Sequence, residues 1–259
     1  MSKKNKIHNT SLIHKDAKIA DNVIIGPYCI IDENVEIDSG TVIDSNVKIL
    51  SGSKIGKNNR IHASTVIGGE PQDLKFKGEK SDLIIGNNNT IREFCTINRG
   101  TEHSGKTIIG NNCLLMAYVH VAHDCIVEDK VILANAVQLG GHSEIGFHAT
   151  VGGVTPVHQF CKIGMHAFIG GGRVVLQDVP PYILATGEPV QYSGINSVGL
   201  CRRNFYQEVR ITIKKVYSLI YRSKYNTMQA IVNIEKRIAP SEEVNNILNF
   251  IKNSERGII

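Results

Sequence analysis

Residues 24–50 read IIGPYCIIDENVEIDSGTVIDSNVKIL, with an isoleucine at every sixth position from Ile25 to Ile49. The same spacing runs from residue 7 to residue 175, where 26 of 29 sixth positions hold Ile, Leu or Val. A period of six is neither the 3.6 of an α-helix nor the simple alternation of an isolated strand, and a fixed repeat of this kind indicates a solenoid. The three exceptions are Asp73, Glu79 and His103.

A second position of the repeat is also selective. The residue two places before most of these aliphatic residues is small or β-branched, as at Val23, Thr41 and Ser53, and glycine often follows the aliphatic residue. Each hexad therefore predicts a short strand and a corner, with inward side chains that are buried only when coils stack. The sequence thus predicts a mainly β fold, a parallel β-helix with a continuous core.

The positions of the cysteines fit a β-helix with inward-facing small residues. Five of the six cysteines fall at the small inward position, where a free thiol acts as a small hydrophobic group. The N-terminal MSKKNKIHNT lacks the apolar segment of a secretion signal, and no long apolar run occurs, so we expect a cytoplasmic chain without disulfides or membrane insertion. The five are Cys29, Cys95, Cys113, Cys125 and Cys161.

Two windows and the C-terminal part depart from the repeat. Residues 68–83 and 98–107 are polar and contain glycine, so we expect loops extending from the β-helix. After Pro180 and Pro181 the period ends, and apolar residues then recur every three or four positions, which predicts about three α-helices. We expect a β-helix over residues 1–190 and a C-terminal helical domain over residues 191–259.

Charge is concentrated in the helical part. The net charge of the chain is +5. Residues 200–225 hold seven Lys or Arg and a single Glu, which favours an acidic protein partner. Aromatic residues make up 6% of the chain and no nucleic-acid-binding motif occurs, which argues against nucleic acid.

The repeat resembles that of the hexapeptide-repeat acyltransferase superfamily, whose members form left-handed coils of three hexads. Residues about 18 apart would then lie one above the other. This spacing places Gly141 over His123 and His142 over Asp124, and it gathers His120, His123, His142 and His158 on one edge. His148 and His166 would lie on another edge. A neutral histidine suits both a general base and a metal ligand, and three histidines could bind zinc across subunits. The cluster favours the base, because a carboxylate adjoins His123 and no two histidines are five residues apart, the ligand spacing of the hexapeptide carbonic anhydrases that this architecture resembles.

Seven segments, in order along nearly the whole chain, resemble the UDP-N-acetylglucosamine O-acyltransferases of lipid A biosynthesis. The resemblance implies transfer of an (R)-3-hydroxyacyl chain from acyl carrier protein to the 3-hydroxyl of UDP-N-acetylglucosamine. It also implies a homotrimer with active sites between subunits, and no metal or cofactor beyond the phosphopantetheine of the carrier. The segments are DLK 73–75, IRE 91–93, AHDC 122–125, LGGH 139–142, VHQF 157–160, DVPPY 178–182 and GLCRRNF 199–205.

The resemblance also assigns roles to residues. His123 matches the general base, Asp124 the residue that orients it, and the backbone N–H of Gly141 the oxyanion donor. Gly171 falls where the family limits acyl-chain length, and a glycine there would leave room for a long chain. The residues that match substrate contacts are Asp73, Lys75, His120, His142, His158, Gln159, Gly171, Asn196, Arg202 and Arg203.

Three other functions remain possible from the sequence. An acceptor with a 3-amino sugar, or the related N-acyltransferase of the pathway, would give an amide, and Asn98, Arg173 and Pro189 depart from the family pattern. An acetyl-CoA-dependent acetyltransferase would need neither the helical tail nor the DLK loop. A non-catalytic β-helix scaffold would leave the histidine cluster unexplained.

Overall fold

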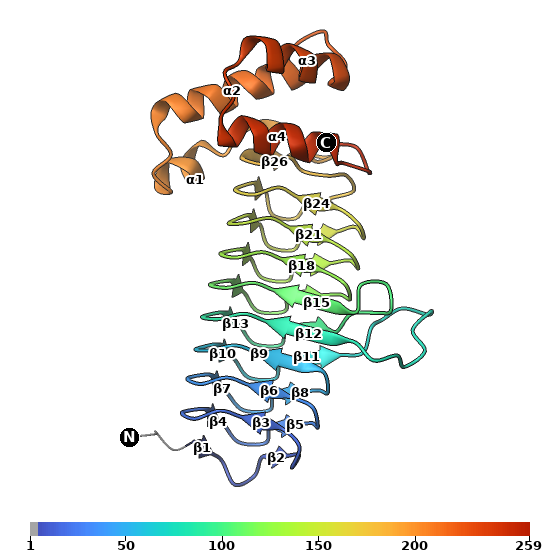
Figure 1. Ribbon diagram of the computed structural model, residues 1–259. Helices are drawn as coiled ribbons and strands as arrows, with labels where there is room; N and C mark the ends of the chain where they lie inside the picture. Colours follow the sequence, from blue (N-terminus) through green and yellow to red (C-terminus); the bar gives the residue numbers. More distant parts are fainter. Residues whose placement is uncertain (1–4) are drawn as a thin grey trace.

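The computed structural model describes residues 5–259. Short strands stack into a three-sided prism that is closed at its C-terminal end by helices (Figure 1). The expected mainly β fold, a parallel β-helix with a helical C-terminal part, is confirmed. Within the described residues, no helix is both long and apolar enough to span a bilayer.

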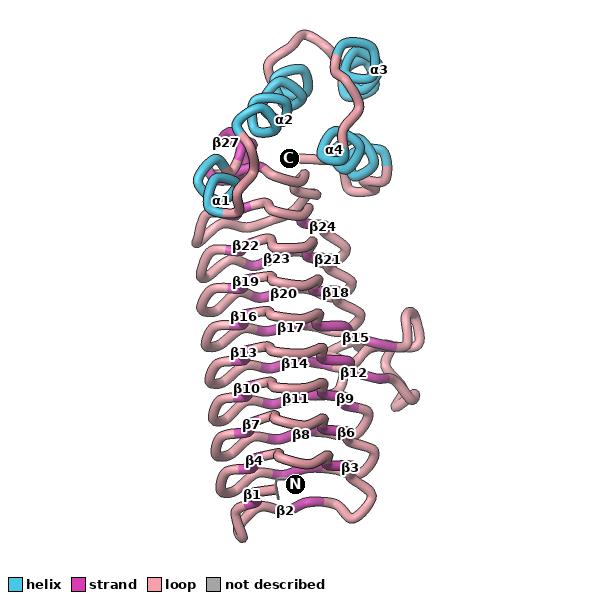
Figure 2. The backbone as a smooth tube through the Cα atoms, turned by 60° about the vertical axis from the view of Figure 1, so that its left-hand side comes forward, coloured by secondary structure: helices cyan, strands magenta, loops and turns pink. Residues whose placement is uncertain are grey.

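The prism has three sheets, one on each face (Figure 2). The first contains β1 (Lys6–Ile7), β4 (Ile24–Ile25), β7 (Val42–Ile43), β10 (Arg60–Ile61), β13 (Thr90–Ile91), β16 (Leu114–Leu115), β19 (Ile132–Leu133), β22 (Thr150–Val151), β25 (Phe168–Ile169), β26 (Ile183–Thr186) and β27 (Gln191–Ile195). The second contains β2 (Leu12–Ile13), β5 (Ile30–Ile31), β8 (Lys48–Ile49), β11 (Val66–Gly69), β14 (Thr96–Asn98), β17 (His120–Val121), β20 (Gln138–Leu139) and β23 (Pro156–Val157). The third contains β3 (Lys18–Ile19), β6 (Glu36–Ile37), β9 (Ser53–Ile55), β12 (Asp82–Ile85), β15 (Lys106–Ile109), β18 (Ile126–Val127), β21 (Glu144–Ile145) and β24 (Lys162–Ile163).

The register follows the period of six. Ile7 pairs with Ile25 in a parallel ladder, and Val127 pairs with Ile145, so each full coil advances the chain by three hexads. From Ile25 onward the aliphatic residues of the repeat are almost fully buried. The five cysteines at the small inward position are buried and free, as predicted, and Cys201, on the helical part, is exposed.

Two loops leave the prism on the same side (Figure 1). They connect β11 to β12 and β14 to β15, so each is a few residues shorter than the polar window that predicted it. The extra residues of both windows extend β11, β12, β14 and β15 to three or four residues, where most strands of the prism have two. Both loops therefore begin and end on strands that pair with each other, β11 with β14 and β12 with β15.

The corners of the prism require a left-handed backbone. The third residue after most of the repeat's aliphatic positions has a positive φ, for example Asn46 at 58°, Asp124 at 60° and His142 at 62°. Side chains at this position leave the prism and stack in columns along its edges. We call the corner after the second sheet the first edge, the corner after the third sheet the second edge, and the corner after the first sheet the third edge.

The C-terminal part contains one more helix than the sequence predicts. The described helices are α1 (Ser197–Arg202), α2 (Gln207–Tyr221), α3 (Thr227–Arg237) and α4 (Glu242–Lys252). Helix α1 has six residues, too few to show a helical period. The expected domain boundary after residue 190 falls between β26 and β27, which form an antiparallel hairpin.

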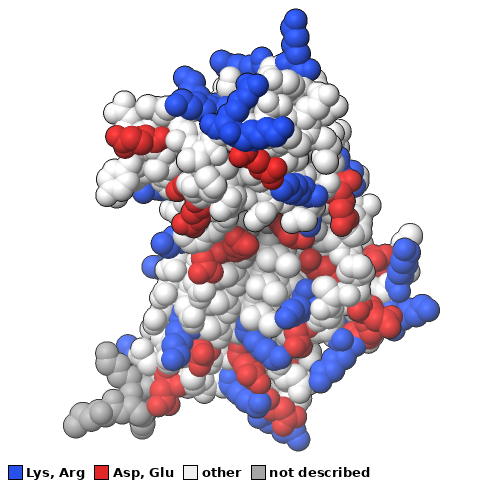
Figure 3. Space-filling model, turned by 45° about the horizontal axis from the view of Figure 1, so that its top comes forward, with Lys and Arg blue, Asp and Glu red and all other residues white. Residues whose placement is uncertain are grey.

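Local sequence explains where the longer helices begin. The side chain of Asn226 accepts from the backbone of Gln229, and Gln229 reaches back to Asn226, which makes a capping box. Ser241 caps α4 with two glutamates in its first turn, as expected. The Tyr217 hydroxyl of α2 donates to the carbonyl of Pro181 at 2.6 Å, so the helices are fixed to the end of the prism. Lys and Arg side chains gather over these helices (Figure 3).

Strand β4 offers a test of the inward ladder. Ile25 is 1% exposed and its neighbour Ile24 is 38% exposed. Ile25→Ala should lower the free energy of unfolding by about 2–5 kcal/mol, because it leaves a cavity between coils. Urea unfolding followed by circular dichroism measures this loss. Ile24→Ala, the control on the same strand, should cost about 1 kcal/mol or less; equal losses for the two variants would contradict the assigned register.

Candidate functional site

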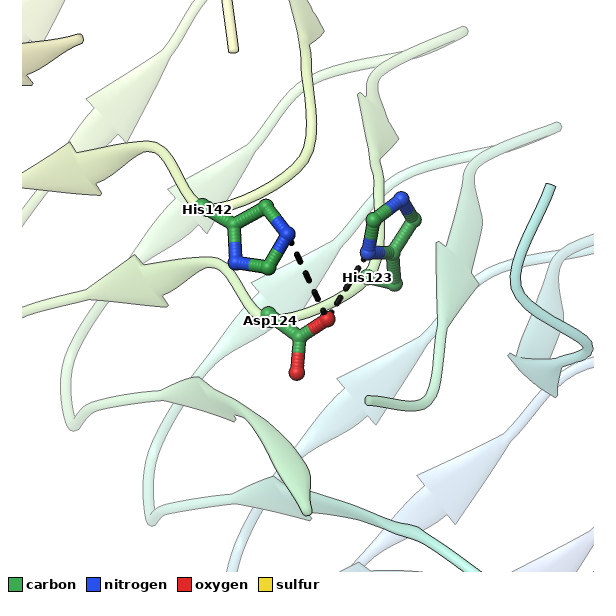
Figure 4. A group of neighbouring side chains, drawn as sticks. All are labelled: His123, Asp124 and His142. Carbon is green, nitrogen blue, oxygen red and sulfur yellow. Dashed lines mark hydrogen bonds and ion pairs between the residues drawn. The ribbon is translucent and has the colours of Figure 1, made fainter. Parts of the chain in front are cut away.

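The first edge brings His123, Asp124 and His142 together. His123 and Asp124 follow β17, and His142 follows β20 in the next coil, where its N–H donates to the carbonyl of His123 at 3.0 Å. Nδ1 of His123 lies 2.8 Å from Oδ2 of Asp124, and Nε2 of His142 lies 3.9 Å from the same oxygen (Figure 4). The predicted stacking of His142 on Asp124 is therefore present.

Asp124 is the most enclosed member of this group. The hydroxyl of Thr101 donates to Oδ2 at 2.8 Å, the N–H of Thr101 donates to Oδ1 at 3.0 Å, and the Ser104 hydroxyl donates to Oδ1. The backbone N–H of Asp124 donates to the Thr107 hydroxyl at 2.8 Å. Burial alone would raise the pKa of Asp124, but hydrogen bonds from Ser104, His123 and Thr101 outweigh it and lower the pKa to about 2. Asp124 is therefore ionised at neutral pH.

The ionised carboxylate fixes the tautomer of His123. A carboxylate only accepts hydrogen bonds, so Nδ1 of His123 must carry the proton that lies between them. Nε2 of a neutral His123 then has a free lone pair. This is the arrangement that a general base needs.

Gly141 lies against the His123 ring, as the spacing of 18 residues predicts. A Cβ atom at Gly141 would lie 2.6 Å from Cε1 and 2.8 Å from Nε2 of His123. Within residues 5–259, the backbone N–H of Gly141 donates to no other group of the protein. The N–H of Gly141 is therefore available to an oxygen atom of a ligand that binds next to His123.

Two further aromatic side chains complete the first edge, and the sequence analysis missed both as site residues. The ring of His103, from the second loop, meets the ring of His142 edge-on at 4.7 Å, and Phe160 stacks on His142 at 4.3 Å. Burial is the main reason that the pKa of His142 is lowered, with His123 and His103 adding to the effect. Phe160 lies 18 residues after His142, so the coil spacing contains the signal for it.

The other predicted contacts on this side differ in how close they come. His120 is on β17, where its Nδ1 lies 2.7 Å from the Thr96 hydroxyl, and burial lowers its pKa. His158 and Gln159 are exposed one coil above Gly140 and Gly141, and Nδ1 of His158 faces the carbonyl oxygen of Gln159 at 3.1 Å. The four predicted histidines thus share one side, but the described ring contact among them joins only His123 and His142.

The first loop approaches the same edge. Asp73 accepts from the backbone N–H of Lys75 at 3.0 Å, and its carboxylate contributes to the charges that act on His142. The Lys75 side chain is exposed. Asn98, one of the departures from the family pattern, is buried at the base of the loop and donates to the carbonyl of Glu70.

The remaining predicted contacts lie on other edges of this chain. Gly171 follows β25 and is on the third edge. Asn196 caps α1, and Arg203 at the opposite end of α1 contacts His166 on the second edge. Arg202 is exposed at the end of α1. A single chain therefore does not bring these four residues to His123.

A metal ion is the other chemistry that the first edge allows. One ligand atom from each of His123, Asp124 and His142 lies within 4.8 Å of the others. Both oxygens of Asp124, however, already accept hydrogen bonds from Thr101 and Ser104. Oδ2 also accepts a hydrogen bond from Nδ1 of His123, so this nitrogen carries a proton and cannot bind a metal ion. The donor set therefore suits a hydrogen-bonded base better than a metal ligand group.

Three family descriptions match parts of the chain. "Udp N-acetylglucosamine O-acyltransferase; Domain 2" covers residues 178–259, the bacterial transferase hexapeptide covers residues 6–39, and the GMPPB C-terminal domain covers residues 27–136. The first of these spans the C-terminal helices. The other two fall on the prism.

Relatives match from end to end. The acyl-[acyl-carrier-protein]–UDP-N-acetylglucosamine O-acyltransferase of Thiobacillus denitrificans is 50% identical over 254 residues, 98% of each chain. The structure of a UDP-N-acetylglucosamine acyltransferase from Bacteroides fragilis superposes with a TM-score of 0.96 at 47% identity, over 98% of this chain and 99% of that one. An Arabidopsis UDP-N-acetylglucosamine acyltransferase superposes with a TM-score of 0.87 at 34% identity, over 97% and 99%.

Gly141→Ala tests the packing around His123. The new methyl group must displace the imidazole, so we expect the rate of the enzyme to fall by roughly a hundredfold, as for a misplacement of about 1 Å. Gly69→Ala is the matched control, because a Cβ there would have its nearest contact at 3.8 Å. Turnover of both variants, with urea midpoints to verify folding, measures the effect; an unchanged rate in Gly141→Ala would contradict this geometry.

The low pKa of Asp124 predicts how stability changes with pH. Its stabilising contribution is fully present above the unfolded value of 3.8 and is lost as the pH falls towards about 2. The difference in free energy of unfolding between wild type and Asp124→Asn should therefore shrink by about 2 kcal/mol between pH 5 and pH 2. Urea titrations of both proteins over this range test it. A difference that is constant with pH would show that Asp124 has an ordinary pKa.

Proposed function

The chain belongs to the acyl-[acyl-carrier-protein]–UDP-N-acetylglucosamine O-acyltransferase family, and from that premise we propose a function for the first edge. The protein transfers an (R)-3-hydroxyacyl chain from acyl carrier protein to the 3-hydroxyl of UDP-N-acetylglucosamine, the first step of lipid A biosynthesis. The observation that carries the proposal is the His123–Asp124 pair, with Gly141 packed against the His123 ring and its N–H without a partner among the described residues.

His123 is the general base. Its Nε2 takes the proton from the sugar hydroxyl as the oxygen attacks the thioester carbonyl. Asp124 holds the imidazole by the 2.8 Å hydrogen bond and stabilises the imidazolium that forms. The loop hydroxyls of Thr101 and Ser104 keep this carboxylate charged and in place.

Gly141 donates to the oxyanion. As the carbon–oxygen bond forms, negative charge moves to the carbonyl oxygen, and the Gly141 N–H stabilises it. Collapse of this intermediate breaks the carbon–sulfur bond, and the protonated His123 returns its proton to the departing thiolate of phosphopantetheine. The step balances without a metal or cofactor in the protein.

Acyl carrier protein docks on the basic helices. Lys and Arg side chains gather on the helical end (Figure 3), and this end is positive while the carrier is expected to be acidic. The basic side chains in question are Arg202, Arg203, Arg210, Lys214, Lys215, Arg222 and Lys224.

The active site is shared between subunits of a homotrimer. The substrate contacts expected at Gly171, Asn196, Arg202 and Arg203 lie on other edges than His123, so only a neighbouring copy can bring them to it. The third edge also carries several large apolar side chains that are exposed in one chain, as expected of a surface that another subunit covers, and two of them, Phe94 and Tyr118, stack on each other. These side chains are Tyr28, Phe94, Tyr118 and Val154. The cytoplasmic address expected from the sequence stays a prediction.

Activity tests the proposal directly. Incubation of the protein with UDP-N-acetylglucosamine and a 3-hydroxyacyl carrier protein should give the acylated sugar nucleotide, detected by mass spectrometry. His123→Ala should lower the rate by roughly 10²–10⁴-fold, because the hydroxyl loses its base. His8→Ala removes an exposed histidine of the first coil and should leave the rate unchanged.

Two outcomes would contradict the proposal. If His123→Ala turned over at the wild-type rate, His123 would not be the base. If wild type formed product only with the 3-amino sugar analogue, the acceptor would be wrong, and an amide in place of an ester would identify the alternative.

A further inference from the structure

The second edge ends in a column of aromatic side chains. His148, His166 and Tyr182 all occupy the left-handed corner position, with φ values of 57°, 57° and 64°. The ring of His166 stacks on Tyr182 at 5.7 Å and meets Phe205 edge-on at 5.0 Å. His166 is 7% exposed, so its ring is enclosed between the prism and the residues that follow α1.

Helix α1 is attached to this corner at both of its ends. At its start, the side chain of Asn196 accepts from the N–H of Gly199 at 3.1 Å and donates to the carbonyl of His166 at 2.9 Å. At its end, Nη1 of Arg203 lies 3.2 Å from Nδ1 of His166. One residue of the prism thus holds two of the expected substrate contacts.

The contact with Arg203 requires a neutral His166. A guanidinium only donates, so Nδ1 of His166 must accept, and the ring proton is on Nε2. Burial lowers the pKa of His166 to about 3, and the positive charges of Arg203 and Lys130 and the neighbouring His148 act in the same direction. His166 is therefore neutral at neutral pH.

A neutral partner has a consequence for Arg203. A carboxylate in this place would neutralise the guanidinium, whereas an imidazole orients it and leaves its full charge. Within residues 5–259, burial is the one influence found on the pKa of Arg203 and no carboxylate forms an ion pair with it, and Lys130 adds positive charge to the same edge. The guanidinium is held in place as a cation without a counter-ion.

We propose that His166 is a positioning residue, which holds the Arg203 guanidinium ready for a phosphate group of the substrate. The inference rests on the proposed function, in which Arg203 contacts substrate. Both substrates carry phosphate esters, the diphosphate of the sugar nucleotide and the phosphodiester of the carrier's phosphopantetheine, so the ligand chemistry is the same for either source.

Two substitutions of His166 distinguish the effect of its hydrogen-bond acceptor from the effect of its aromatic ring. His166→Phe keeps an aromatic ring and loses the acceptor, and phenylalanine already occupies the left-handed corner at Phe94 and Phe160. His166→Asn loses the ring but places an oxygen acceptor near the position of Nδ1, and asparagine tolerates this backbone well. A purely structural role of the ring would make His166→Asn the more damaging change.

Steady-state kinetics gives the main readout. His166→Phe should raise the KM for one of the two substrates about tenfold with little change in kcat, since binding is affected and the chemistry is not. The substrate that responds identifies the source of the phosphate. His166→Asn should stay within about threefold of wild type. An unchanged KM in His166→Phe, or a loss confined to kcat, would overturn the proposal.

A double-mutant cycle tests whether His166 acts through Arg203. His166→Phe should add nothing to the defect of Arg203→Ala, because the group that His166 positions is gone. A full additional loss in the double variant would overturn the proposal.

Calorimetry with inorganic pyrophosphate gives a readout that does not depend on turnover. Wild type should bind it more tightly than His166→Phe, and equal affinities would overturn the inference. If wild type bound pyrophosphate in this way but made no acylated nucleotide, the proposed function would fail while the inference stood.

Discussion

The stacking of coils in register is the constraint on which the rest of this structure depends. A coil can bury its aliphatic residues and satisfy its backbone only against the next coil, so the ladder fixes where every corner residue lies relative to those above and below. This constraint places Gly141 on the ring of His123 and His142 over Asp124. The same constraint places His166 beneath Tyr182, where a helix end can be attached to it. The geometry of the proposed active site therefore follows from the periodicity of the fold.

The second loop supplies hydrogen-bond donors that the repeat itself does not contain. A carboxylate at a corner would ordinarily face water, yet Asp124 is enclosed by hydroxyl and N–H donors of the second loop. These donors, more than the histidine alone, overcome the cost of burying the charge. The two histidine environments are opposite in character. His123 is held by an anion, and His166 is held against a cation. The anion leaves Nε2 of His123 unprotonated, and the cation requires Nδ1 of His166 to accept a hydrogen bond.

The prism and the core of the site could be predicted from the sequence because both are periodic. The inward isoleucines, the inward cysteines and the neighbours of His123 all follow from steps of 6 and 18 residues, and Phe160 could have been found in the same way. Thr101, Ser104 and His103 could not, because a loop carries no period and its hydrogen bonds depend on how it folds. Helix α1 is too short to show a pattern. The attachment of Arg203 to His166 joins residues whose separation in the chain follows no repeat.

The distribution of the expected contacts over three edges bears on how such a chain can evolve. Each corner contacts mainly its own coil and the coils next to it. The surroundings of Gly171 on the third edge are Gly152 and Gly153, so a substitution there should leave the hydrogen bonds of Asp124 on the first edge intact. If Gly171 limits the acyl chain, as the family resemblance implies, a substitution there can change the chain-length preference while the proposed base His123 and its partner Asp124 stay unchanged. The position that would set the acyl-chain length and the residues that would carry the chemistry can therefore change independently of each other, because they lie on different edges.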